Sequence, residues 1–520
     1  MTWNDTFQLV RRCMEKSRDE SKPCEPMIRC LKRLQEVFSA SRMNPMRSRL
    51  EIIAKQHGMG FHISEATCYL TADLFYLEVQ LLPSGTVEEV KVASHGKSPV
   101  PSESFLQLLR LKKLADFSTK LGSLFAQYNI PGDNEIKLKL LASLQHLGKN
   151  LRKISNLPRT PKHCDPKMEM INNGWVGYLI AGKEDCPLTV QFFTHPGDEK
   201  KTSDSHEEAV VHAAQVTVGV SDVPRQLQMA CVVPKPPQLD PCSYPVFTPP
   251  SEMLPACFLL QLQPAITMMS SFVKKLGHIT AVTVPDVDLQ WAPLPKLLMR
   301  GSLGANNRWG TLDQQETTFQ LPLPSGVMHS YIFPGAAWSA AAHKGATVGS
   351  VPFTHPAHVP ALLELLRQQC TINTLLGSCF APQQGARPGS GCDVHFEVLP
   401  ESDTSFSVTF QRPDANSLAV LQVSVLHPHR ITCRLFGAGT FESSLNEYLS
   451  TVMMRCLSVP VTMGTLYSRL EELTSAPLSA GRPESEHDRS SPSSAAVTDI
   501  NRGWAALPRK TDSACLDRRP

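Results

Sequence analysis

Two pairs of histidines are spaced so that each pair could share a metal ion. His355 and His358 lie three residues apart, and His427 and His429 lie two apart. A protein metal site needs further nitrogen, sulfur or carboxylate ligands besides two imidazoles. Neither pair has a cysteine or a carboxylate nearby at ligand spacing, and both lie beside proline. We therefore expect solvated loop histidines and no metal site.

Two further motifs are near matches to acid–base and phosphate-binding sites. Asp286 and Asp288 could do acid–base work only in a shaped pocket that separates their pKa values, so a solvated turn is the expected structure. Gly96-Lys97-Ser98 resembles the end of a phosphate loop, but Lys91 stands where its leading glycine belongs and Pro99 follows directly. The sequence has no Gly-x-Ser-x-Gly elbow and no His-Glu-x-x-His helix. It predicts no catalytic residue, no cofactor and no enzyme activity.

The motif Leu-x-x-Leu-Leu occurs twice, at Leu294–Leu298 and at Leu362–Leu366. On a short helix its three leucines share one face and can enter an apolar groove of a partner. A buried amphipathic helix shows the same spacing, and further apolar residues around the second copy predict that it belongs to the core. The first copy is flanked by prolines and is more isolated. Its candidate partner-binding residues are Leu294, Leu297 and Leu298.

Composition indicates a folded protein of several domains. The chain has 520 residues, 42% apolar and 19% charged, which suggests two to four domains. Its 42 prolines favour strands and loops over long bundles in the middle of the chain. The 15 cysteines are odd in number and include no Cys-x-x-Cys, which predicts free thiols in a reducing compartment. We find no signal peptide and no run long enough to span a membrane.

Charge is uneven along the chain. The net charge is +3, yet residues 1–160 hold 24 basic and 16 acidic residues, a difference of +8. A basic region can face nucleic acid or an acidic protein. Because these positive residues occur singly or in pairs without interleaved aromatic residues, we expect a solvated helical surface and no direct sequence-specific binding of nucleic acid.

The fold class predicted from periodicity is α+β. Apolar residues alternate along Phe75–Leu81, Pro83-Ser84-Gly85 turns the chain, and Val87–Val92 returns, which predicts a β-hairpin. Helical patterns surround it, and Ser102 is a suitable N-cap. We predict a helical domain at 1–155 with hairpin 69–93, a linker at 156–172, a β-rich, proline-rich domain at 173–345, an α+β domain at 346–475 with helix 360–376 and meander 394–436, and a short disordered tail at 476–520.

Several ordered stretches together resemble one known family. They include Cys68–Pro99, Tyr128–Asn134, Phe406–Pro413 and Arg455–Met463. With these the chain resembles the amino-terminal, Mediator-anchoring region of the Mediator of RNA polymerase II transcription subunit 1 family, as a shortened paralogue. The resemblance implies a non-enzymatic nuclear protein that docks in the Mediator middle module.

The function expected from this resemblance is that of a scaffold linking transcription activators to RNA polymerase II. Other middle-module subunits would be its partners, and no membrane would be involved. Long family members carry receptor-binding leucine boxes in a Ser-rich disordered region, whereas this sequence ends at Pro520. Binding to nuclear receptors is therefore a weaker expectation. The alternative is a Mediator-independent adaptor that retains the same fold, and localisation would separate the two.

Overall fold

The computed structural model describes most of the first 475 residues. Residues Met1–Glu471 form one compact unit and Glu472–Pro520 a second. The tail expected at 476–520 lies outside the described residues. Within the described part, no helix is both long and apolar enough to cross a membrane. The described ranges are 3–16, 25–157, 165–180, 185–195, 211–227, 252–284, 289–302, 317–322, 327–380, 394–413, 416–437 and 442–475.

The first sheet is antiparallel, with its strands in chain order. Its hairpin β3–β4 lies where the period-two pattern predicts it, and alternate residues of β3 are buried. The prediction of a single hairpin understates this sheet, because β1 is largely exposed and β5 has only two residues, so neither shows alternation. The strands are β1 Gly60–Ser64, β2 Thr67–Thr71, β3 Phe75–Leu81, β4 Val87–Ser94 and β5 Val100–Pro101.

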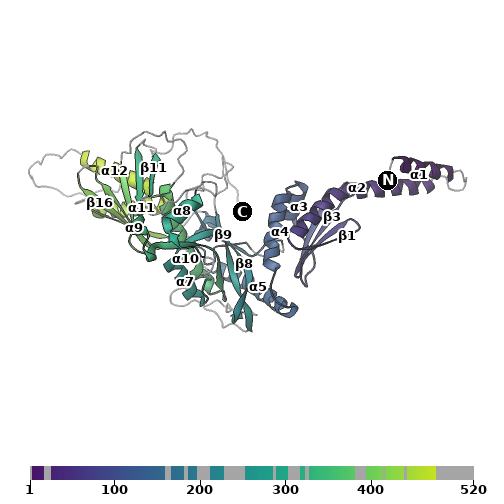
Figure 1. Cartoon of the computed structure of the whole chain (residues 1–520), viewed down its shortest axis with the longest axis horizontal. Helices are drawn as coiled ribbons and strands as arrows, with labels where there is room; N and C mark the ends of the chain where they lie inside the picture. The colour runs from purple at the N-terminus through teal and green to yellow at the C-terminus, as the bar shows by residue number, and fades with distance from the viewer. Residues whose placement is uncertain are drawn as a thin grey trace, which may run out of the picture. The chain divides into compact units, whose positions relative to one another are not determined.

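Helices make up most of the other described residues up to residue 155. Helix α2 contacts β1 and β2, and α3 contacts β4 (Figure 1). Ser102 caps α3 as predicted, because its Oγ accepts a hydrogen bond from the N–H of Phe105 at 3.3 Å. The helices are α1 Trp3–Lys16, α2 Glu25–Gln56, α3 Glu103–Arg110, α4 Leu114–Tyr128 and α5 Asn134–Ser155.

Helix α6, Pro166–Asn173, lies in the segment predicted to be a linker, 156–172. Its first turn has two helix-start signals: Pro166 stands at the beginning, and the carboxylate of Asp165 accepts from the N–H of Lys167 at 2.8 Å. The segment therefore contains a helix that the sequence did not predict, and its role as a linker between domains stays a prediction. Residues 158–164 lie outside the described residues.

The second sheet has the strand order β10-β13-β9-β8-β7-β6 and is antiparallel throughout. Helices α7, Ser270–Thr280, α8, Leu294–Ser302, and α10, His358–Gly377, contact its central strand β9. The strands are β6 Tyr178–Ile180, β7 Thr189–Thr194, β8 Val211–Leu227, β9 Glu252–Met269, β10 Ala292–Pro293 and β13 Lys344–Phe353.

The third sheet has the order β11-β12-β14-β15-β16-β17. Strands β14 to β17 form an antiparallel meander in the region expected, 394–436, whereas β12 and β14 pair in parallel. The strands are β11 Thr317–Pro322, β12 Met328–Phe333, β14 Val394–Pro400, β15 Ser405–Gln411, β16 Leu418–His427 and β17 Arg430–Phe436. The helices of this region are α9 Gly335–Trp338, α11 Glu442–Cys456 and α12 Val459–Ser475. Two short 3-10 helices are η2 Ala341–His343 and η3 Ser378–Phe380.

Both later sheets combine strands from either side of the predicted boundary at residue 345. Strand β13 begins at Lys344 and belongs to the second sheet, and β11 and β12 precede the boundary but belong to the third. The predicted domains 173–345 and 346–475 therefore do not coincide with the sheets. Local patterns do not reveal such pairing, because it joins segments that are far apart in the sequence.

Candidate partner-binding residues and the junction around helix α10

The three candidate partner-binding leucines differ in their accessibility. Leu294 begins α8 and is fully buried, Leu298 is half-buried against the core, and Leu297 is half-buried. Leu294 packs beside Gly345, where an added Cβ would lie 3.1 Å from Leu294 Cδ1 and 2.9 Å from the carbonyl oxygen of Met268. Their role in partner binding stays a prediction, and only Leu297 and Leu298 expose surface for it.

The second leucine motif lies inside the protein, as the surrounding apolar residues predict. Leu362, Leu363 and Leu366 on α10 are fully buried, and Leu365 is 8% exposed. Helix α10 contacts α7 and α8 as well as strands of the second and third sheets. The motif therefore packs a central helix and presents no leucine face to a partner.

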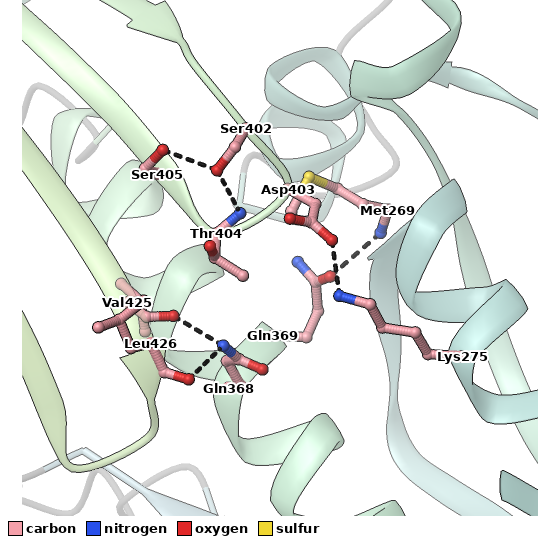
Figure 2. A network of polar contacts seen from close by, with 10 residues as sticks. All are labelled: Met269, Lys275, Gln368, Gln369, Ser402, Asp403, Thr404, Ser405, Val425 and Leu426. Atoms are coloured by element: carbon pink, nitrogen blue, oxygen red, sulfur yellow. Dashed lines mark hydrogen bonds and ion pairs between the residues drawn. The ribbon is translucent and has the colours of Figure 1, made fainter.

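Polar side chains of the same helix bind the second sheet. Gln369 is fully buried, and its Oε1 accepts a hydrogen bond from the N–H of Met269 at the end of β9, at 3.1 Å (Figure 2). One turn later, Asn373 Nδ2 donates to the carbonyl of Thr267 at 2.8 Å. Gln369 Nε2 also donates to Asn373 Oδ1 at 2.9 Å. These bonds pair backbone groups of β9 that the helix covers.

The neighbouring glutamine binds the third sheet instead. Gln368 Nε2 donates to the carbonyl oxygens of Val425 and Leu426 on β16, at 2.7 and 3.0 Å (Figure 2). A second link runs from Lys275 of α7 to Asp403 in the β14–β15 turn, with Nζ and Oδ2 2.6 Å apart. Both charged side chains are partly exposed, so this ion pair contributes at most about 1 kcal/mol.

Arg367 links α10 to another strand of the second sheet, β7, and to the end of α6. The side chain is 5% exposed, and its Nε donates to the carbonyl of Phe192 on β7 at 2.8 Å. Its Nη2 donates to the carbonyls of Ile171 and Gly174, at the end of α6, at 2.9 and 2.8 Å. A guanidinium group suits this position because its fork of donors reaches separate acceptors at once.

This junction was not predicted from the sequence. Residues 367–369 each bind a different element, and Figure 2 shows the two glutamines pointing in different directions from α10. The available signal was the polar run Arg367-Gln368-Gln369 inside an otherwise apolar helix. Buried polar groups need partners, so such a run indicates contacts with backbone elsewhere.

A polar cluster joins the first helices to the second sheet. The carboxylate of Asp185 accepts from Ser102 Oγ at 2.6 Å and from Ser104, and Lys120 Nζ lies 3.6 Å from it. Burial raises the pKa of Asp185, but the bonds from the two serines and the charge of Lys120 outweigh it and hold the pKa below its ordinary value. Nearby, Gln215 Nε2 on β8 donates to the carbonyl of Ser123 on α4 at 2.6 Å.

The histidine pairs lie in different surroundings. The rings of His355 and His358 are 6.0 Å apart, His355 Nδ1 accepts from the N–H of Ala357, and burial lowers the pKa of His358. His427 Nδ1 lies 3.3 Å from a carboxylate oxygen of Glu364 on α10. In the described ranges no three potential ligands gather around a metal position.

The other two motifs considered from the sequence are Gly96-Lys97-Ser98 and the pair Asp286 and Asp288. Gly96 lies in the turn between β4 and β5 with φ of 75°, a left-handed conformation that glycine adopts readily. The turn leads into the short strand β5 and not into a helix, so no helix N-terminus lies at this turn to bind a phosphate. Asp286 and Asp288 lie outside the described residues.

Comparison with known proteins identifies the family. The sequence model of Mediator of RNA polymerase II transcription subunit 1 matches residues 28–381, which is more than half of the chain. The chain belongs to the Mediator subunit 1 family. The matched range of this family begins in α2 and includes the polar run on α10, whereas the meander β14–β17 lies beyond it.

Curated members of the family show the same relationship. The chain is 31% identical over 491 residues to Mediator of RNA polymerase II transcription subunit 1 of Xenopus tropicalis, covering 91% of this chain and 31% of that protein. For the Drosophila melanogaster protein of the same name the identity is 23% over 478 residues, covering 86% of this chain and 31% of that protein. The chain therefore spans about a third of the length of these relatives.

Proposed function

We propose that this protein is a non-enzymatic subunit of the Mediator coactivator complex. It acts in the nucleus as a scaffold that links transcription activators to RNA polymerase II, with other subunits of the middle module as its partners. The observation that carries the proposal is family membership across residues 28–381, together with relatives named as Mediator subunit 1 that align with about nine tenths of the chain.

The arrangement around α10 supports a scaffold role. A single helix binds four separate elements through Arg367, Gln368 and Gln369, and its leucines are buried in the core. Such a helix holds the two later sheets together, because Arg367 and Gln369 bind buried backbone groups of the second sheet and Gln368 binds β16 of the third. A fixed arrangement of surfaces suits a protein that binds several others.

Direct binding of nuclear receptors through leucine motifs is a weaker part of the proposal. Of the two motifs, the one on α10 is buried, and the one on α8 has a buried first leucine. A helix bound in a receptor groove must offer all three leucines. Helix α8 would have to leave β13 and β9 before it could do so.

Affinity purification of the tagged full chain from nuclear extract tests the proposal. Recovery of middle-module subunits in constant proportion to the tagged chain is the expected result. A chain that enters the nucleus and is recovered without any Mediator subunit would contradict the proposal and favour the adaptor alternative. Exclusive localisation to the cytoplasm would do the same.

A further inference from the structure

Strand β1 lies at an edge of the first sheet and pairs with β2 alone. Ser64 and Thr67 close the two-residue turn of this hairpin, so they form a hydrogen-bonded pair, and such pairs alternate along the ladder. The backbone N–H and C=O groups of Phe61 and Ile63 therefore point away from β2. In the part of the chain that the structure describes, no loop or side chain forms a hydrogen bond with these outward groups.

Three other sheet edges of the same protein, at β17, β5 and β10, are covered or shortened. At β17, the N–H of Leu435 donates to Asn446 Oδ1 at 2.7 Å, and that of Cys433 donates to Ser450 Oγ at 2.8 Å. Strands β5 and β10 are two residues long and each ends in proline, which has no N–H. In contrast, β1 is five residues long and offers two outward donors and two outward acceptors.

The side chains at this edge are also incompletely covered. Ile63 lies opposite Cys68, which lies opposite Val79, and both of these are fully buried, so Ile63 extends the core face of the sheet. It is nevertheless 45% exposed. On α2, which contacts β1, Ile52 is 57% exposed. The apolar side chain of Ile63 therefore remains partly uncovered at the open edge.

We propose that β1 receives an extended segment of a partner polypeptide as a sixth strand of the first sheet. Backbone groups of that segment would pair with those of Phe61 and Ile63, and its apolar side chains, at alternate positions, would bury Ile63. Its intervening side chains would lie beside His62, on the face where the rings of His62 and Tyr69 stack 4.9 Å apart. The inference rests on the proposed function, since the donor is another subunit of the assembly.

Variants at Ile63 test the edge directly. Ile63→Pro removes an outward N–H and leaves the hydrogen bonds between β1 and β2, and Ile63→Lys places a charge at the edge. Val223→Lys on β8, where Val223 is 55% exposed, is the matched control. In purification from nuclear extract, both Ile63 variants should recover about tenfold less of the middle-module subunits than the parent, with an unchanged melting temperature. The control should recover as much as the parent.

Hydrogen exchange provides a second measurement that does not depend on the variants. The amides of Phe61 and Ile63 should exchange at least about tenfold more slowly in the purified assembly than in the isolated chain. Recovery of Mediator subunits with no slowing at these amides would overturn this inference and leave the proposed function standing. Recovery of no Mediator subunit by the parent would overturn both. Slow exchange in the isolated chain, with the mass of a dimer, would show that a second copy occupies the edge and would also overturn the inference.

Discussion

Gln368 and Gln369 are adjacent on α10, yet their side chains bind different sheets. Gln369 Oε1 accepts from Met269 of the second sheet, and Gln368 Nε2 donates to Val425 and Leu426 of the third. Successive residues of an α-helix point about 100° apart. One turn of helix therefore connects the two sheets, and this relationship can be tested residue by residue.

Gln369→Leu should lower the free energy of unfolding by about 1–3 kcal/mol, because it leaves the buried N–H of Met269 without an acceptor. Gln368→Leu should cost less, since Gln368 is half-buried and water can replace it at the carbonyls of β16. Urea unfolding followed by tryptophan fluorescence measures both. If the two variants lost equal free energy of unfolding, the burial of Gln369 would not explain its contribution to stability.

Arg367→Met should be more damaging than either glutamine variant. It leaves the buried carbonyls of Phe192, Ile171 and Gly174 without their hydrogen-bond donor. Each carbonyl that water cannot reach should lower the free energy of unfolding by about 1–3 kcal/mol. Arg367→Lys should rescue little, because a single ammonium group cannot span both β7 and α6. Thermal melting of the two variants checks this. A lysine variant that melts like the parent would contradict the argument from geometry.

Leu365→Ala should lower the free energy of unfolding by about 2–5 kcal/mol, the usual cost of emptying a buried leucine site. Leu297→Ala should cost less, because Leu297 is only half-buried. The pair compares equivalent positions of the two leucine motifs. If Leu365→Ala melted at the same temperature as the parent protein, the leucine motif on α10 would have to be accessible. The motif would then again be a candidate for binding a partner.

The cover over β17 predicts an edge effect. Asn446→Leu removes the acceptor for the N–H of Leu435 and should cost about 1–3 kcal/mol. It should also promote association between molecules, because an uncovered edge strand can pair with another chain. Glu447→Leu, on the exposed side of the same helix, is the control for added apolar surface. Light scattering at equal concentrations should rise for the first variant and stay low for the second.

His212 predicts a pH dependence of stability. Its ring lies 6.4 and 5.6 Å from those of Phe192 and Phe193, and burial lowers its pKa below the ordinary 6.5. The unfolded chain thus takes up a proton on His212 at a higher pH than the folded chain does. The stability that neutral, buried His212 contributes is therefore present above about pH 6.5 and is lost as pH falls through the lowered pKa. His212→Phe should lose less stability than the parent between about pH 7 and 5. The measurement is the melting temperature of both proteins as a function of pH. An equal fall in melting temperature for the parent and the variant would contradict this prediction.

The sequence alone determined the features that depend on local pattern. Alternating apolar residues predicted the β3–β4 hairpin, and leucine spacing with further apolar neighbours predicted that Leu362–Leu366 is core. Ordered motifs along the chain indicated the family. These features depend on the period of a strand or helix and on residue types in a fixed order, and both can be read directly from neighbouring positions.

The tertiary structure alone decided how distant segments combine. Strands β11 and β12 join β14 across some sixty residues, Leu294 is buried against Gly345, and residues 367–369 bind four separate elements. The polar run 367–369 would be equally consistent with a solvent-exposed helix face if no strand lay opposite α10. The edge at β1 is likewise visible only once its neighbours are known. Which backbone groups lack partners depends on every other segment of the chain, and local sequence carries no record of that.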